Sequence, residues 1–407
     1  MRILVMAAGS HGDVAPYTGL GAHLRVEGHD VALAAPETFR PLVTDSGLDF
    51  RPLPVDPRGI PTSAAGGRSE LLARATAFIE QLGDALADAA APGADLLLLS
   101  TTTAPLGWHL AEAMNIRSLG VYLQPTLPTG DFPPVVGGGR SLGRWGNRAA
   151  GALGQRIVDR LHAESARRLR ARLGLPAQSQ GARRRSVERA DWPVLHGFSP
   201  TLVPRPSDWR AGASVVGNWW PHVAVDYRLP AEVEDFLQAG PPPVFIGFGS
   251  MATGQGERLG ALAADALRRA GVRGVLQAGW AGLVGEGDDV LSIGEAPHGH
   301  LFPRMAAVVH HAGAGTAAAT LRSGVPSVPV PVMADQPFWA NRLARTGAAT
   351  TPVGFADLTA ARLAEAIRRA VEDRSLREHA EAAARAMAEE DGVARVAEAV
   401  AAMGGDR

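Results

Sequence analysis

The chain has 407 residues, of which 46% are hydrophobic and 20% charged, so it is long enough for two domains with separate cores. Its formal net charge of −1 gives no electrostatic reason to expect nucleic acid as a partner. The absence of cysteine excludes disulfides, thiolate nucleophiles and cysteine-ligated metals. Lysine is also absent, so enzymes that need a phosphate-binding or Schiff-base lysine are not expected.

Apolar runs alternate with helical periodicity, which predicts α/β architecture with parallel sheets. In the first half we expect strands at 2–8, 30–35, 48–53, 95–100, 117–121 and 194–198, and helices at 16–27, 71–89, 105–114 and up to about 189. Pro16 then falls in the first turn of its helix. No apolar run is long enough to span a membrane and the N-terminal run is too short for a signal sequence, so we expect a cytoplasmic protein.

A long Pro/Gly-rich loop is predicted at 124–139, and the proline-rich region 199–243 has no convincing periodic element. Alternation then resumes, with strands predicted at 244–248, 272–277, 306–310 and 327–332, a helix at 259–270 and a helical tail from Thr359. We therefore predict an N-terminal domain at 1–220 and a C-terminal domain at 221–385. A last helix at 386–407 is expected to pack back on the first domain.

Asp13 lies in the turn between the first strand and the first helix. One interpretation is a helix N-cap, a position that favours aspartate. The other is a general base, because an aspartate at the carboxyl end of a strand can accept a proton from a substrate hydroxyl. His11, in the same turn, is the second candidate for the base.

The segment from Ala306 to Pro337 is the most informative part of the chain. It predicts a buried strand, a glycine turn carrying His310 and His311, a helix starting near Gly315, and a second strand ending at Asp335-Gln336. A helix N-terminus offers free N–H groups and partial positive charge, which suits a phosphate. Polar groups at the end of the next strand suit a sugar, so the segment indicates a nucleotide-sugar site.

Other turns of the second half offer weaker signals. Ser250 follows an apolar strand and is a candidate for a phosphate contact, whereas Trp280 is a candidate for stacking on a base. The backbone at Ala296–His298 is a candidate for pairing with a base edge. Asp288 and Asp289 lack suitably spaced partners, so no metal site is expected.

A dinucleotide site is the competing interpretation. Residues 313–318 satisfy G-x-G-x-x-A after a strand, and Asp335 follows about 20 residues later. The histidines before the glycines are unusual for that site, and no dehydrogenase-like catalytic pair is visible. An NAD(P)-dependent oxidoreductase is therefore the alternative to a nucleotide-sugar enzyme.

Together these motifs resemble bacterial GT-B glycosyltransferases of the UDP-glycosyltransferase superfamily, especially antibiotic-tailoring enzymes of the vancomycin group and sterol-glucosyltransferase-like proteins. The resemblance extends over almost the whole chain in order. It rests on GSHGDVAP at 9–16, YLQPTLPTGDFPPV at 122–135, FSPTLVPRPSDW at 198–209, GFGSM at 247–251, APHGHLFPRMAAVVHHAGAGT at 296–316 and DQPFW at 335–339.

The resemblance implies two Rossmann-like domains facing across a cleft and an inverting reaction that needs neither metal nor cofactor. Asp13 would be the base, and His11 replaces a more usual arginine. The residues implied to hold the TDP- or UDP-sugar donor are Ser250, Trp280, Ala296, His298, His311, Gly313, Ala314, Gly315, Thr316, Asp335 and Gln336.

The acceptor is expected to be a mostly apolar natural-product aglycone bound by the N-terminal domain. Candidate lining residues are Trp108, Tyr122, Gln124, Phe132 and Trp145, each of which is equally well explained by core packing. A non-catalytic helper of another transferase and a nucleotide-sugar epimerase are further alternatives. Either a monomer or a homodimer is expected.

Overall fold

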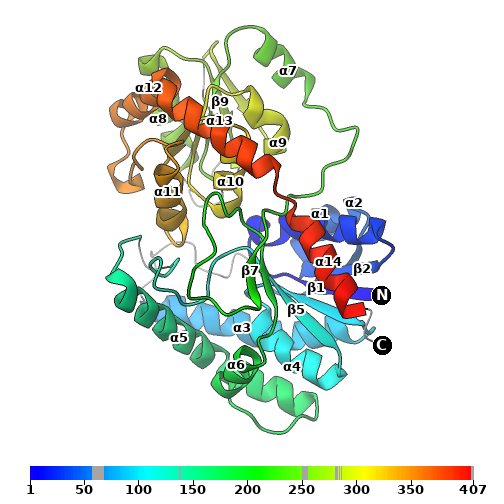
Figure 1. Ribbon diagram of the computed structural model, residues 1–407. Coiled ribbons are helices and arrows are strands. Elements are labelled where there is room, and N and C mark those ends of the chain that lie inside the picture. Colours follow the sequence, from blue (N-terminus) through cyan, green and yellow to red (C-terminus); the bar gives the residue numbers. More distant parts are fainter. Residues whose placement is uncertain are drawn as a thin grey trace.

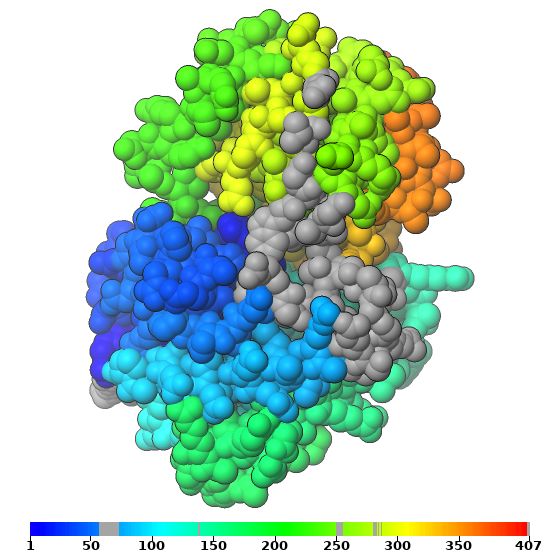
Figure 2. Space-filling model, turned by 180° about the vertical axis from the view of Figure 1, so that it is seen from behind, coloured from blue at the N-terminus to red at the C-terminus, as the bar shows by residue number. Residues whose placement is uncertain are grey.

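The computed structural model describes residues 1–56, 68–136, 139–249, 255–279, 283, 285 and 287–404, with the backbone only for 68–72. The chain forms two α/β lobes, one built mainly from the first half of the sequence and one from the second (Figure 1). Seen from behind, the lobes lie one above the other and are in contact (Figure 2). The predicted α/β class with two Rossmann-like domains is confirmed.

The first sheet is entirely parallel, in the order β3-β2-β1-β4-β5-β6-β7. Its strands are β1 (Arg2–Met6), β2 (Asp30–Pro36), β3 (Asp49–Leu53), β4 (Leu96–Leu99), β5 (Arg117–Tyr122), β6 (Val194–His196) and β7 (Ala213–Val215). Residues 3–6 of β1 and all of β4 are continuous apolar runs because helices cover both faces of the sheet.

The second sheet is also parallel, in the order β10-β9-β8-β11-β12. Its strands are β8 (Val244–Gly247), β9 (Gly274–Gln277), β10 (Val290–Ile293), β11 (Ala307–His310) and β12 (Ser327–Pro329). Both sheets thus share one topology. Strands β2 and β3 lie on one side of β1, and β4 lies on its other side; in the same way β9 and β10 lie on one side of β8, and β11 lies on its other side.

Helices pack on both faces of each sheet. The first-lobe helices are α1 (His11–Val26), α2 (Arg40–Asp45), α3 (Arg68–Ala90), α4 (Ala104–Met114), α5 (Gly143–Arg172) and α6 (Gln180–Arg189). The later helices are α7 (Ala231–Gln238), α8 (Gly256–Ala270), α9 (His298–Leu301), α10 (Ala314–Arg322), α11 (Gln336–Arg345), α12 (Ala360–Glu372), α13 (Arg374–Ala388) and α14 (Gly392–Gly404). None of the helices in the described ranges is both long and apolar enough to cross a bilayer.

Three local predictions were wrong. The first helix begins at His11 rather than Pro16, because Ser10 caps it, and Pro16 lies inside it. The region 199–243 is not without regular structure, since it contains β7 and α7. Strand β10 was not predicted, because it is an edge strand that is only partly buried and lacks a long apolar run.

The chain crosses between the lobes twice, at two points that touch. The first crossing follows Trp219, whose ring is buried beside Tyr17 and whose Nε1 donates to the carbonyl of Gly392 (3.0 Å). The second crossing lies between α13 and α14, where Glu390 accepts hydrogen bonds from the Ser199 hydroxyl (2.6 Å) and the Thr201 hydroxyl (3.0 Å). Helix α14 then packs on α1 and adds Val396 and Val400 to the core of the first lobe (Figure 1).

An apolar cluster joins the lobes beside these crossings. Phe132 lies edge-on to Phe338 with ring centroids 5.3 Å apart, and Phe198 lies edge-on to Trp339 at 5.9 Å. All four rings are buried, so this contact contributes hydrophobic stabilisation that holds the lobes together.

Candidate active site

Each sheet has one topological switch point, at which the connections from two neighbouring strands lead toward opposite edges of the sheet. In the first sheet this point lies between β1 and β4, and in the second between β8 and β11. Ligands of doubly wound sheets bind at such points, beyond the carboxyl ends of the strands. Asp13 follows β1 and His311 follows β11, so these two predicted residues lie at the two switch points.

Asp13 occupies the third position of α1 and forms a capping box with Ser10. Its Oδ2 accepts hydrogen bonds from the backbone N–H and the hydroxyl of Ser10, both at 2.8 Å. Its Oδ1 has no hydrogen-bond partner within the described residues. Burial raises the pKa of Asp13 above the ordinary range, and the hydrogen bonds from Ser10 act in the opposite direction. The N-cap itself is Ser10, which the sequence analysis missed although the S-x-x-D pattern at 10–13 signals it.

His11, the second candidate base, is the first residue of α1 and is exposed. Its ring lies edge-on to Phe39, with ring centroids 6.2 Å apart. His11 therefore lies beside Phe39, the residue that precedes α2, and comes two residues before Asp13 in the chain.

The two adjacent histidines after β11 have different environments. His310 is fully buried: its Nδ1 accepts from the backbone N–H of Ala312 (3.0 Å), so Nε2 carries the proton that it donates to the Ser327 hydroxyl (2.7 Å). His310 thus holds the turn in shape. Burial lowers the pKa of His311 to about 4, against the opposing effect of the Gly247 backbone. Its buried Nδ1 has no well-formed hydrogen bond to any described residue.

Glycines leave room for the His311 ring. A Cβ on Gly249 would lie 2.8 Å from its Cε1, and one on Gly313 would lie 2.6 Å from its Nε2. Gly313 also caps α10, and the backbone N–H groups of Ala314, Gly315 and Thr316 have no acceptor within the described chain. The helix start and His311 therefore present several donors at one place, which suits an anion such as a diphosphate.

Asp335 caps α11 and is held across the boundary between the lobes. Its Oδ2 accepts a hydrogen bond from Trp339 Nε1 (2.9 Å). It accepts a second from Nε2 of Gln124, which is a residue of the first lobe (3.0 Å). Gln336 is buried, and its Oε1 accepts from the backbone N–H groups of Val332 (2.8 Å) and Met333 (3.2 Å). Gln336 thus shapes the loop before α11, and the contact between Gln124 and Asp335 was not foreseen.

Ionisable groups of the two lobes interact electrostatically across the boundary between them. Burial raises the pKa of Asp335, and the negative charge of Asp13 raises it further. Burial lowers the pKa of His298 to about 4, and His311 and His11 lower it further. In both cases the interacting groups belong to different lobes: Asp335 interacts with Asp13, and His298 interacts with His11.

Two strained residues adjoin this site. Ala312 and Ala334 have positive φ angles of 62° and 56°, a region that alanine rarely occupies. One follows His311 and the other precedes Asp335. Strain of this kind persists where the surrounding structure imposes it, and it is concentrated at ligand sites.

The predicted base pocket is described only in part. His298 begins α9 and stacks on Phe302, with ring centroids 4.3 Å apart and planes at 13°. Ala296, in the loop before α9, packs on the apolar cluster that contains Phe302. Ser250 and Trp280 lie outside the described residues.

The five predicted acceptor residues do not form one group. Trp108 and Tyr122 are buried in the first-lobe core, where both contact Trp192. Phe132 belongs to the cluster between the lobes, Gln124 contacts Asp335, and Trp145 is 90% exposed at the start of α5.

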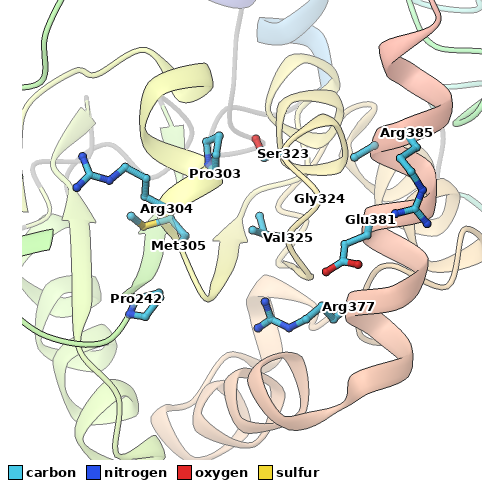
Figure 3. A pocket seen from close by; sticks show the side chains of 11 residues that line it. Pro242, Pro303, Arg304, Met305, Ser323, Gly324, Val325, Arg377, Glu381 and Arg385 are labelled. Carbon is cyan, nitrogen blue, oxygen red and sulfur yellow. The ribbon is translucent and has the colours of Figure 1, made fainter. Parts of the chain in front are cut away.

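A groove of about 460 Å³ lies elsewhere on the second lobe, between the end of α10 and α13 (Figure 3). The side chains of Arg304, Arg377, Glu381 and Arg385 border it. None of the predicted donor-binding residues lines this groove, so it is separate from the candidate active site.

Comparison with known proteins agrees with this geometry. Residues 3–91 match the glycosyltransferase family 28 N-terminal domain, and residues 282–403 match the erythromycin biosynthesis protein CIII-like C-terminal domain. The chain is 37% identical over 415 residues to O-mycaminosyltylonolide 6-deoxyallosyltransferase of Streptomyces fradiae, covering 97% of this chain and 95% of that protein.

More distant relatives extend the comparison. The chain is 32% identical over 424 residues to a sterol 3-beta-glucosyltransferase of Arabidopsis thaliana, covering 97% of this chain but only 64% of that protein. Its fold resembles that of the Streptomyces sp. SF2575 glycosyltransferase SsfS6, solved with thymidine diphosphate (TM-score 0.62, 23% identity, 98% of this chain and 99% of that chain). The chain therefore belongs to the GT-B glycosyltransferases of the UDP-glycosyltransferase superfamily, and it is of the hexosyltransferase type.

Proposed function

We propose that this protein transfers a sugar from a TDP- or UDP-sugar to a hydroxyl of a mostly apolar natural product, with inversion and without a metal ion. One observation carries the proposal: Asp335 of the second lobe accepts a hydrogen bond from Gln124 of the first lobe (3.0 Å) and lies within electrostatic range of the Asp13 carboxylate. A base and an anion site on opposite sides of one space are what a direct displacement at the anomeric carbon requires.

In this reaction the acceptor hydroxyl attacks the anomeric carbon while Asp13 Oδ1 takes its proton. The bond from the anomeric carbon to the diphosphate breaks, and the diphosphate leaves with the electron pair on the opposite face. The start of α10 and His311 stabilise its charge, a role that a metal ion fills in other enzymes. Among the described residues, no three histidine, aspartate or glutamate side chains are grouped as a metal site.

The names of two relatives support a natural-product acceptor. One relative is named for O-mycaminosyltylonolide and another for a sterol. A thermal-shift panel of nucleoside diphosphates and nucleotide sugars identifies the donor, since a ligand at 100 times its Kd stabilises the folded state by about 2.7 kcal/mol. An acceptor screen with the best donor then follows.

The variant Asp13→Asn tests the base, because the asparagine Oδ1 preserves the hydrogen bonds from Ser10. We expect kcat to fall by about 10²- to 10⁴-fold while the nucleoside diphosphate still binds. Near-normal turnover would refute the role of Asp13. Activity is also expected to persist in excess EDTA, and loss of activity that Mn²⁺ restores would refute the metal-free mechanism. A helper protein would show no turnover with any acceptor.

A further inference from the structure

The turn that presents Asp13 is built around the carboxylate itself. Gly9 has φ +146°, and a Cβ at this position would lie 2.4 Å from Asp13 Oδ2. The chain then continues through Ser10, whose N–H and hydroxyl both point to that oxygen at 2.8 Å. A side chain at position 9 would push the carboxylate away, so the glycine and the serine together define where Oδ2 lies.

The hydroxyl of Ser10 does more than begin a helix. The backbone N–H of Asp13 bonds to the Ser10 carbonyl (2.9 Å), and the hydroxyl proton is donated to the Asp13 side chain. Two donors thus hold one carboxylate oxygen, and the other oxygen has no partner among the described residues. A carboxylate fixed at one oxygen has only its second oxygen available for a substrate proton.

We infer that Ser10 is a positioning residue for the general base: its two donors hold Asp13 Oδ2 and aim Oδ1 at the acceptor hydroxyl. The inference rests on the proposed function, in which Asp13 is the base. Hydrogen bonds to a carboxylate stabilise its ionised form, so Ser10 also keeps Asp13 able to accept a proton in a site whose burial favours the neutral form.

Other ionisable groups surround this carboxylate. Tyr17 on the same helix and Asp335 at the start of α11 both sense the charge of Asp13, and His11 lies two residues before it. Asp335 disfavours a second negative charge in the site. The donors of Ser10 oppose that effect, and the Ser10 hydroxyl can be removed without changing the charge of the site.

The test compares the pH profiles of kcat/KM for the wild type, Ser10→Ala, Ser10→Gly and Ser10→Thr. Loss of the hydroxyl raises the pKa of Asp13, so the acid limb of the profile should move to higher pH in Ser10→Ala and Ser10→Gly. Activity then falls several-fold on the acid side and much less on the plateau. Ser10→Thr keeps a hydroxyl and should restore the wild-type limb.

A purely structural role predicts a different result. Ser10→Ala removes a helix cap at a cost of about 1 kcal/mol, whereas glycine is nearly as good a cap as serine. A structural role would therefore lower the melting temperature of Ser10→Ala alone and leave both acid limbs in place, and that result would overturn the inference. Asp13→Asn is measured in parallel: if it keeps turnover, the proposed function has failed, whereas an inactive Asp13→Asn with unshifted Ser10 variants refutes only the role of Ser10.

Discussion

The contact between Gln124 and Asp335 gives a prediction that separates two roles for one residue. Gln124 Nε2 donates to Asp335 Oδ2 across the boundary between the lobes, so Gln124→Ala removes one of the two donors on that oxygen. A hydrogen bond to a charged group contributes about 1.5–3 kcal/mol. Because Gln124 is only half-buried, we expect about 1.5 kcal/mol, which is a roughly tenfold rise in the KM for the donor.

Steady-state kinetics with donor and acceptor varied separately measure this effect. The KM for the acceptor should stay within about twofold, since the contact is made with the donor side of the site. Trp339→Phe, which removes the other donor on the same oxygen, serves as the matched variant. In an Asp335→Asn background Gln124→Ala should have little further effect, because coupled residues are not additive. A raised acceptor KM with an unchanged donor KM would refute this reasoning and place Gln124 in the acceptor pocket.

Three further predictions concern stability and the anion site. Burial lowers the pKa of His196 to about 3 and that of His311 to about 4, so the unfolded chain takes up protons that the folded chain does not as the pH falls below 6.5. The free energy of unfolding should then fall by about 1.4 kcal/mol per pH unit for each such histidine, measured by urea denaturation between pH 7.5 and 5; a flat profile would contradict this burial. A Cβ at Gly315 would lie in open space, so Gly315→Ala should not destabilise the free protein. The added methyl group should nevertheless reduce the thermal shift that a nucleoside diphosphate produces. An undiminished shift would count against the start of α10 as the anion site. Trp219→Phe loses the hydrogen bond to the Gly392 carbonyl and should lower the free energy of unfolding by about 1–2 kcal/mol, with unchanged stability as the contrary result.

The central strands were predictable because they are buried on both faces. The runs at 3–6 and Leu96–Leu99 are continuous and apolar, which is typical of parallel strands covered by helices on both faces. The edge strands Ala213–Val215 and Val290–Ile293 are short and partly exposed, so their sequences need no apolar run and gave no signal.

Some residues of the candidate site were predictable from the sequence and others were not. Local motifs placed Asp13, His311 and Asp335 at the ends of strands, because a turn after a buried strand is defined by neighbouring residues. The contact of Gln124 with Asp335 joins residues 211 positions apart and depends on how the two lobes meet, which no local pattern encodes. The aromatic residues predicted for the acceptor follow no local motif that would distinguish a pocket from the core. Trp108 and Tyr122 lie in the core of the first lobe.

The two adjacent crossings between the lobes determine how this protein can be divided. A fragment that ends before Trp219 lacks both that tryptophan and α14, so the apolar surface of α1 that they cover would be left in water. A hybrid enzyme that exchanges the segment between Trp220 and Glu389 for that of a relative would instead keep α14 on its own sheet. Exchange of the second lobe between such enzymes is therefore an insertion with two adjacent junctions, rather than a joining of two halves.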